Sequence, residues 1–375
     1  MASPTTPVPV VPDYEGACLT GVVPPLLLAP PGGRPDWFPA PLQSARRVVL
    51  LVLDGLGWQQ IQRHRSLLGN LSAMTGGPIT TVAPSTTATA LTSLVTGAAP
   101  LQHGILGYRM DMSGTIMNTL SWSGRRPDER RRDLRGVFPP RSVQPVPSFC
   151  GLSVPVITRA EHADTGFTEA HLGHTSFRGW RAPSSIAVEI RRSFDEGHDF
   201  VYAYYDGVDK IAHERGFGVH YEAELRATDH LLGEVLASVP SDVTVAVVAD
   251  HGQVHTGDDL VELDHDVLAL VDHQSGEGRF RWLHAREGRV DDLVSALQRY
   301  ASIAWIMTRT QVVDEKLFGR PGDPSFLRRL GDVALLPHGT ASFEDPDDTG
   351  AFPLVCRHGS LTEAEMMVPF LAASV

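Results

Sequence analysis

The chain has 375 residues, 42% of them hydrophobic, and a formal net charge of −12. A chain of this length can bury a substantial core, in one large domain or two. The negative charge argues against a general binder of nucleic acid or anionic membranes, because it would be repelled by phosphate polyanions. The three scattered cysteines (Cys18, Cys150 and Cys356) are too few for a disulfide framework or a Cys-rich zinc site.

The N-terminus lacks the features of a signal peptide. "MASPTTPVPVVPDYEG" has neither a basic start nor an apolar core, and no apolar run in the chain approaches membrane-spanning length. We therefore expect a cytoplasmic protein that binds no membrane and no nucleic-acid polymer. Residues 1–44 are rich in Pro and Gly, and they are predicted to form an extended arm over a domain rather than regular elements.

Three apolar runs that end in an acidic residue and a turn predict strands buried on both faces. They are "RRVVLLVLDG" (46–55), "DFVYAYYDG" (199–207) and "DVTVAVVADHG" (242–252). Helical patterns such as "SSIAVEIRRSF" and "YEAELRATDHLLGEVLASV" lie between them. This alternation predicts an α/β fold with a mostly parallel central sheet flanked by helices.

Two stretches do not follow this alternation of strands and helices. Residues from about 108 to 183 are loop-rich and include the Arg-dense "GRRPDERRRDLRG", which is typical of a solvated loop. Residues 261–344 contain a strand–helix–strand pattern, "GRFRWLHA", "RVDDLVSALQRYA" and "IAWIMT", which predicts a small α+β insertion. The core is therefore predicted to comprise residues 45–260 and 345–375, with the loop-rich insertion inside it.

Acidic residues and histidines follow the predicted strands. A single Asp at a strand end is usually a turn former or a helix cap. Several carboxylates and imidazoles that converge on one sheet edge need a cation, and ligands without thiolates suit zinc, manganese or a similar divalent ion. The candidate ligands are Asp54, Asp209, His213, Asp250, His251 and His358. Asp209 and His213 are four residues apart, so on a helix they would project from one face.

Five motifs occur in a fixed order along the chain: "VLDGLG", "APSTTATALTSLVTGAAPLQHGI", "YYDGVDKIAHERG", "VVADHG" and "RHGSLTEAEMMVPFL". Together they resemble the alkaline phosphatase superfamily, and most closely its type I phosphodiesterase and nucleotide pyrophosphatase branch. The resemblance covers roughly residues 45–258 and 350–373. It implies an alkaline phosphatase-like core, two divalent metal ions, zinc being favoured, and a Thr or Ser nucleophile.

The resemblance also implies a role for each matching residue. The ligands of one metal would be Asp54, Asp250 and His251, and those of the other Asp209, His213 and His358. The nucleophile of the family precedes the "LVTG" helix by a fixed interval, which selects Thr87 and places it beside the metals.

The local sequence agrees with Thr87 as the nucleophile. Pro84 and Ser85 indicate a helix entry, so Thr87 would lie in the first turn, where free N–H groups favour an anion. A divalent ion would lower the pKa of its hydroxyl enough for attack. Ser85, Thr86 and Thr89 are expected to face the helix cap or the packed core.

The sequence thus predicts a two-metal hydrolase of small phosphate esters, and we favour a phosphodiesterase that forms a phospho-threonine intermediate. Ala90 stands where many diesterases of this branch have an Asn that holds a nonbridging oxygen, and no aromatic slot for a nucleobase is evident. A phosphomonoesterase, a phosphomutase or a phosphonate hydrolase of the same superfamily therefore stays open, as do the substrate-binding residues and the oligomeric state. A binding protein without catalysis is disfavoured, because all six ligand positions and the nucleophile are filled.

Overall fold

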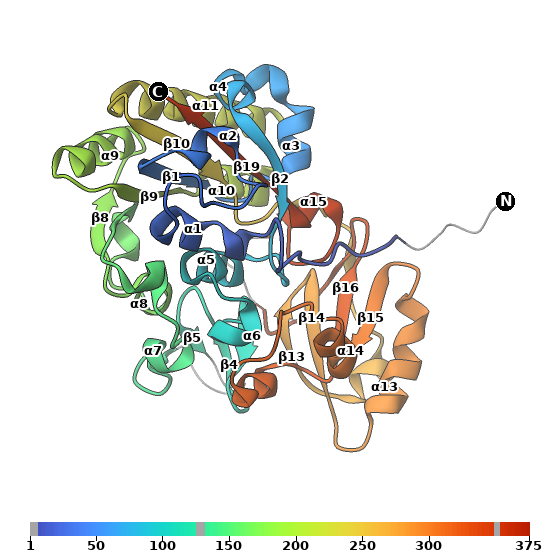
Figure 1. Ribbon diagram of the computed structural model, residues 1–375. Coiled ribbons are helices and arrows are strands. Elements are labelled where there is room, and N and C mark those ends of the chain that lie inside the picture. Colours follow the sequence, from blue (N-terminus) through green and yellow to red (C-terminus); the bar gives the residue numbers. More distant parts are fainter. Residues whose placement is uncertain (1–6, 125–131, 349–352) are drawn as a thin grey trace.

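A seven-stranded sheet forms the centre of the computed structural model, which describes residues 7–124, 132–348 and 353–375 (Figure 1). The strand order is β2-β19-β10-β1-β9-β7-β8. These strands are β1 (Arg47–Leu53), β2 (Thr75–Thr80), β7 (Pro155–Arg159), β8 (Ser176–Trp180), β9 (Phe200–Tyr205), β10 (Val243–Val248) and β19 (Met367–Ser374). Five neighbours, β10, β1, β9, β7 and β8, run parallel, and β19 is antiparallel to both β10 and β2. The predicted α/β fold with a mostly parallel central sheet is confirmed.

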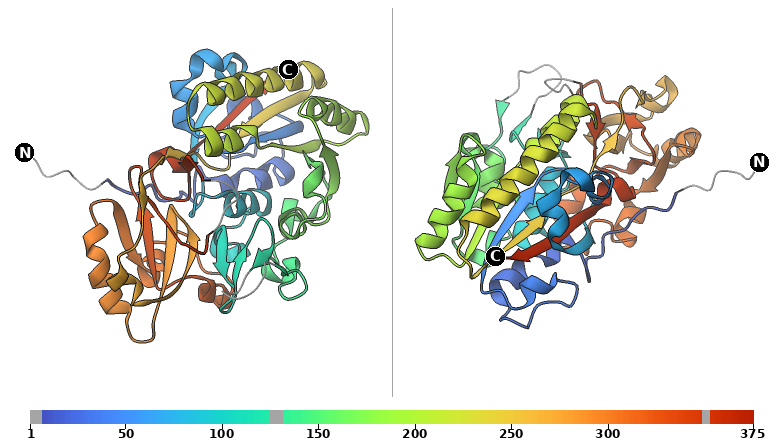
Figure 2. Two further views of the ribbon diagram at one scale, coloured as in Figure 1. Left: turned by 180° about the vertical axis from the view of Figure 1, so that it is seen from behind. Right: turned by 90° about the horizontal axis from the view of Figure 1, so that it is seen from above.

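The three strands predicted from apolar runs lie in the middle of this sheet. Every residue of β9 and β10 is buried, and so is every residue of β1 except its first. Helices flank the sheet: α9 (Ser185–Asp195) packs on α11 (Val219–Ser238), and α5 (Thr87–Thr96) packs on α1 (Val23–Leu28) and α8 (Gly166–Leu172) (Figure 2). Strands covered in this way need apolar side chains on both faces, which is why their sequences do not alternate.

The N-terminal segment contains helices, so the prediction of an arm without regular elements is wrong in this respect. A 3-10 helix at Leu19–Gly21, α1 and α2 (Ala40–Gln43) precede the first strand. Pro24 and Pro25 lie in the first turn of α1, where their missing N–H groups leave no helical hydrogen bond unmade. Val23 and Leu26 are buried in the main core, and this packing stabilises a short helix that the prolines alone would not predict.

The segment from 108 to 183 is more regular than predicted. Its first half forms a four-stranded sheet of β3 (Arg109–Asp111), β4 (Ile116–Asn118), β5 (Ser123–Gly124) and β6 (Arg132–Asp133), and α7 (Pro140–Val143) follows. Its second half supplies β7 and β8 to the central sheet. The sequence hides β8 because this edge strand, "SFRGW", is only partly buried and has no apolar run. Residues 125–131 of the Arg-dense stretch lie outside the described residues.

Most of segment 261–344 forms a second layer with its own apolar cluster, which includes Leu293, Leu297 and Leu335. An antiparallel sheet of order β13-β14-β16-β15 lies beside the β3–β6 sheet, with β13 against β3. Its elements are α12 (His265–Leu268), β13 (Val271–Glu277), β14 (Phe280–Ala285), α13 (Val290–Leu297), β15 (Ala304–Thr308), α14 (Arg309–Asp314) and β16 (Val333–Pro337). We retain 261–344 as the proposed limits of the insertion.

Short elements connect these layers. They are α3 (Trp58–Arg63), α4 (Gly69–Ala73), α6 (Pro100–His103), α10 (Gly207–Arg215), β11 (Val254–His255), β12 (Leu260–Val261), β17 (Ser342–Phe343), β18 (Cys356–Arg357) and α15 (Glu363–Met366). Across the described residues, no helix is both long and apolar enough to cross a membrane.

Candidate active site

The parallel register of the central strands brings Asp54 and Asp250 to one edge of the sheet. Val52 of β1 lies opposite Val248 of β10, so the two strands end level with each other. Asp54 follows β1 directly, and Asp250 comes two residues after the end of β10. The backbone N–H of Gly55 donates to Asp250 Oδ1 at 3.0 Å, which fixes the two turns against each other.

Asp54, Asp250 and His251 form a first buried cluster whose donor atoms all lie within 4.8 Å of one another. His251 Nε2 lies 3.4 Å from Asp54 Oδ1 and 3.4 Å from Asp250 Oδ2. Neither of these two oxygens has a hydrogen-bond partner among the described residues. Buried carboxylate oxygens without partners are costly, and a divalent cation between them would remove the cost. The donor set therefore fits a metal ion.

Asp209, His213 and His358 form a second cluster beside the first. His213 Nε2 lies 3.3 Å from Asp209 Oδ1 and 3.2 Å from His358 Nε2. Asp209 and His213 project from one face of α10, as their spacing predicts. The rings of His251 and His358 stack with centroids 3.6 Å apart, so the two clusters adjoin. All six predicted ligands are thus brought together at one edge of the central sheet.

His358 reaches this edge by a different route from the one predicted. It does not follow a strand of the central sheet, because the strand before it, β18, pairs with β11 in a separate two-stranded sheet. β11 begins shortly after His251. Because Val254 of β11 pairs with Arg357 of β18, the next residue, His358, lies close to His251. A non-local strand pair therefore completes the second cluster.

Each of the three imidazoles in these clusters is oriented by a backbone carbonyl. The Nδ1 atoms of His251, His213 and His358 lie 3.0, 2.6 and 2.9 Å from the carbonyl oxygens of Gly252, Cys356 and Ser85, respectively. A carbonyl oxygen can only accept, so each Nδ1 carries the hydrogen and each Nε2 keeps a lone pair. Metal-ligating histidines are commonly held in this way by a second hydrogen bond. The arrangement leaves three nitrogen donors directed at the clusters.

Burial and mutual repulsion shift the pKa values of these groups. Burial raises the pKa of Asp54 well above its usual value, and the charges of Asp250 and Asp209 raise it further. Burial also raises the pKa of Asp209. The pKa of His358 is well below its usual value because of burial and because His251 and His213 are close. Ionised carboxylates are thus disfavoured unless a cation is present, and His358 is neutral, as a ligand must be.

Thr87 is the first residue of α5, and its hydroxyl lies at the two clusters. Thr87 Oγ1 is 3.0 Å from His251 Nε2, and Thr87 lines the same pocket as Asp54 and Asp209. The first turn of a helix has N–H groups without intrahelical partners, and these favour an anion at this position. The prediction that Thr87 lies in a first turn agrees with the helix bounds.

The hydroxyls next to Thr87 are buried, as expected for the helix cap or the packed core, but neither Ser85 nor Thr86 makes a capping bond. Thr86 is the N-cap residue, but its side chain makes no capping bond and donates instead to Glu277 Oε2 at 3.1 Å. Ser85 Oγ donates to the carbonyl of Ser360 at 2.7 Å. Segments distant in sequence supply these acceptors, so the local pattern could not predict them. Thr89 is fully buried, in agreement with the expected packed core.

Tyr204 and Gln253 contact the candidate ligands and were not predicted. The Tyr204 hydroxyl donates to Asp54 Oδ2, and Gln253 Nε2 donates to Asp209 Oδ1 at 2.8 Å. Tyr204 lies opposite Val52 in the β1–β9 register, two residues before Asp54. The pairing of the two apolar runs could have identified this tyrosine, whereas Gln253 has no signal beyond its place after the Asp-His-Gly turn.

A pocket of about 210 Å³ adjoins Thr87. Its walls combine apolar side chains such as Leu91 and Phe167 with polar ones such as Lys210. The rings of Phe167 and His171 stack with centroids 3.9 Å apart. No aromatic slot was evident in the sequence, because Phe167 and His171 lie on α8, far along the chain from the motifs.

Residues 48–361 match the sequence model of a family described as type I phosphodiesterase / nucleotide pyrophosphatase. The chain belongs to this family. Membership identifies it as a phosphoric ester hydrolase and confirms the resemblance to this branch of the alkaline phosphatase superfamily. A comparison with curated proteins finds no match.

Solved structures of murine and human ectonucleotide pyrophosphatase / phosphodiesterase 5 share the fold of the chain. The murine structure has a TM-score of 0.63 at 15% identity, and the human one has a TM-score of 0.60 at 14% identity. In both comparisons the match covers 87% of this chain and 87% of the other. Another murine structure is described as an inactive Thr-to-Ala variant in complex with AMP, with a TM-score of 0.62, 14% identity and the same coverage of both chains.

Proposed function

We propose that this phosphoric ester hydrolase is a two-metal phosphodiesterase that acts on small esters through a phosphorylated Thr87. The observation that carries the proposal is the position of the Thr87 hydroxyl, which lies 3.0 Å from His251 Nε2 at a helix N-terminus. The two clusters of carboxylates and imidazoles adjoin this hydroxyl. Two buried carboxylate oxygens of the first cluster have no hydrogen-bond partner among the described residues, and a cation would compensate for their burial.

The two metal sites are proposed from the donor sets. Asp54, Asp250 and His251 would hold one divalent ion, and Asp209, His213 and His358 the other, with Thr87 Oγ1 as a further ligand. Mixed nitrogen and oxygen donors without thiolates favour zinc, and manganese is the main alternative. The bound ions would neutralise phosphate charge and lower the pKa of the Thr87 hydroxyl.

Thr87 would act as the nucleophile. Its Oγ1 would bond to phosphorus while the ester P–O bond breaks and the alcohol leaves, and water would then cleave the phospho-threonine and restore the hydroxyl. The first-turn N–H groups of α5 would contact the phosphate during both steps. The inactive Thr-to-Ala variant of the murine protein is consistent with a threonine in this role.

The pocket beside Thr87 is proposed to bind the organic part of the ester. Phe167 and Leu91 offer apolar contacts, and Lys210 Nζ offers a positive charge, although it also pairs with Asp206 at 2.6 Å. A planar group could pack on the Phe167 side of the pocket. The AMP found with the murine variant makes a nucleotide ester a reasonable first substrate to test.

A substrate panel with labelled water tests the proposal. Aryl phosphate diesters, including a nucleotide aryl ester, should be hydrolysed faster than aryl phosphate monoesters and phosphonates when zinc is supplied. Water labelled with ¹⁸O should place one labelled oxygen in the phosphate product. A preference for monoesters, or return of phosphate to a different hydroxyl of the substrate without label, would contradict the proposed diesterase reaction.

A further inference from the structure

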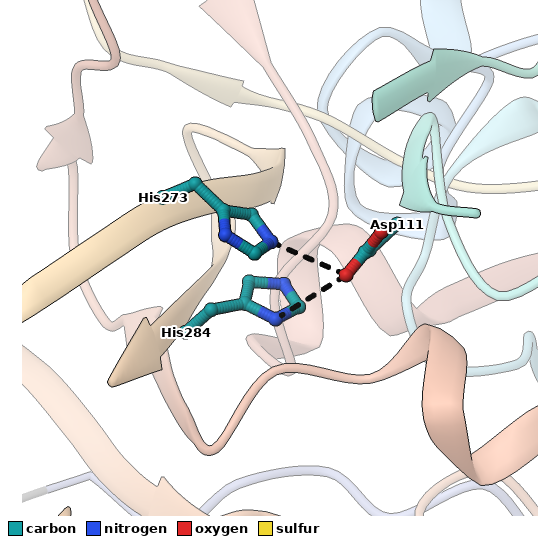
Figure 3. Close-up of side chains that lie close together, drawn as sticks. All are labelled: Asp111, His273 and His284. Carbon is teal, nitrogen blue, oxygen red and sulfur yellow. Dashed lines mark hydrogen bonds and ion pairs between the residues drawn. The ribbon is translucent and has the colours of Figure 1, made fainter. Parts of the chain in front are cut away.

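A third cluster of metal-ligating side chains lies outside the candidate active site. His273 on β13 and His284 on β14 are directly opposite each other in the hairpin, and their rings stack with centroids 3.9 Å apart. Asp111, the last residue of β3, faces both rings (Figure 3). None of the three residues belongs to the two clusters around Thr87.

One nitrogen of each ring converges on a single carboxylate oxygen. His273 Nε2 lies 3.2 Å from Asp111 Oδ2, and His284 Nδ1 lies 3.7 Å from the same oxygen (Figure 3). Ligand atoms around a tetrahedral zinc ion, bonded at about 2.1 Å, stand about 3.4 Å apart. The two distances to Asp111 Oδ2 bracket this value, and all three donor atoms lie within 4.8 Å of one another, so the cluster can supply three corners of such a tetrahedron.

The other polar atom of each side chain is held by a neighbour. His273 Nδ1 lies 3.0 Å from Asp272 Oδ2, and Ser275 Oγ lies 2.9 Å from His284 Nε2. The backbone N–H of Gly114 donates to Asp111 Oδ1 at 2.6 Å. Outer hydrogen bonds of this kind orient metal ligands and leave the inner atoms free to bind.

Two carboxylates flank the ring of His273, with Asp272 at Nδ1 and Asp111 at Nε2. A carboxylate only accepts, so the hydrogen on Nδ1 is donated to Asp272 and a neutral ring would turn its Nε2 lone pair toward Asp111. A proton on Nε2 would instead make an ion pair between His273 and Asp111, and zinc content distinguishes that pair from a bound ion. A divalent cation satisfies all three atoms at once.

We infer that Asp111, His273 and His284 form a further divalent-metal site, for which zinc is the best-suited ion. Two nitrogens and one oxygen from three strands supply three ligands, and the partly exposed side chain of His273, 31% accessible, leaves the fourth position open to water. The site would join the β3–β6 sheet to the β13–β14 hairpin, across 162 residues between Asp111 and His273.

Such a junction would brace the strand that reaches the candidate nucleophile. Glu277, four residues after His273 on β13, accepts the hydrogen bond from Thr86, the residue before Thr87. Four residues of strand correspond to about 13 Å. The proposed ion is therefore a structural one, placed along β13 from the active site and not within it.

Zinc stoichiometry measured on the full chain tests this inference. After dialysis against zinc and removal of the excess, His284→Gln should contain one zinc ion per chain fewer than the wild type. His230→Gln, which replaces an exposed histidine on α11, should contain as much as the wild type. The difference isolates this site whether or not ions occupy the clusters around Thr87, so failure here and failure of the proposed function are distinguishable.

A second variant covers the case in which His284→Gln does not fold. Asp272→Asn changes an exposed side chain that holds His273 from outside, and it should weaken binding of one zinc ion by about 10- to 100-fold in competition with a chelating dye. Zinc content and affinity equal to the wild type in the variants that fold would overturn the inference. In that case the cluster would be an ion pair between His273 and Asp111 only.

Discussion

Replacing Thr87 by Ala should separate catalysis from stability. The change removes the hydroxyl 3.0 Å from His251 Nε2 and leaves the six proposed metal ligands in place. Thr89 provides the matched control, because it lies in the same helix and its buried hydroxyl has no hydrogen-bond partner among the described residues. Thr89→Val keeps the shape of the side chain and removes only that hydroxyl.

The loss of stability should be small. One hydrogen bond contributes about 0.5–1.5 kcal/mol to folding, and Ala regains a few tenths of a kcal/mol because it is a better helix former than Thr. We expect Thr87→Ala to lower the free energy of unfolding by at most about 1 kcal/mol, or Tm by less than about 4 °C. Its zinc content should stay close to that of the wild type.

The loss of activity should be large. Without the nucleophile, kcat/KM for an aryl phosphate diester should fall at least about 10³-fold, which corresponds to about 4 kcal/mol of transition-state stabilisation. Thr89→Val should stay within about threefold of the wild type. Initial rates at saturating zinc, together with thermal unfolding of both variants, provide the measurement. Wild-type turnover by Thr87→Ala would refute Thr87 as the nucleophile.

Three further predictions concern the surroundings of the site and the core. Tyr204→Phe should weaken zinc binding by about 10- to 100-fold in a chelator competition, because it removes the hydrogen bond to Asp54. Tyr202→Phe is the control and should not weaken zinc binding, because the Tyr202 hydroxyl has no hydrogen-bond partner among the described residues. Equal effects of the two variants would contradict the role of Tyr204 in holding Asp54. Phe167→Ala should raise KM about 2- to 10-fold for an aromatic diester and leave a methyl ester unchanged; equal shifts for both esters would exclude a stacking role. Burial, together with the charge of Arg329, lowers the pKa of His103 in the folded chain to about 3. In the unfolded chain His103 takes up a proton below about pH 6.5, while in the folded chain it stays neutral. The free energy of unfolding should therefore fall by about 1 kcal/mol between pH 7 and 5.5. Urea unfolding of His103→Gln should show that much less acid dependence, and an unchanged pH profile would contradict it.

The sequence predicts those site residues whose position depends on parallel strand ends. Asp54 and Asp250 meet because β1 and β10 are parallel neighbours that end level, and Asp209 and His213 share a face of α10. Both relations follow from regular geometry, which local patterns specify well. The α/β core was predictable for the same reason.

The motifs identify His358 as a candidate ligand, but local patterns do not predict contacts made across long separations. His358 reaches the site through the β11–β18 pair, and Thr86 bonds to Glu277, 191 residues away. Neither contact leaves a periodic signal. The edge strand β8 was missed because edge strands are only partly buried, so their side chains need not be apolar.

The third metal-ligand cluster shows the same limit most clearly. Asp111 ends a three-residue strand, and His273 and His284 become neighbours only when the β13–β14 hairpin sets their register. No spacing along the chain relates Asp111 to the two histidines. Side chains gathered by tertiary structure alone become visible only when the fold is known.

Trapping the covalent intermediate would show whether Thr87 attacks phosphorus. The zinc-loaded enzyme should be mixed with excess diester, quenched in acid within the first turnovers, digested and examined by mass spectrometry. If Thr87 is the nucleophile, a phosphoryl adduct should appear on the peptide that contains Thr87, localised to that residue and absent from Thr87→Ala. Full turnover with no adduct on any peptide, or an adduct on Ser85 or Thr86 instead, would contradict this role.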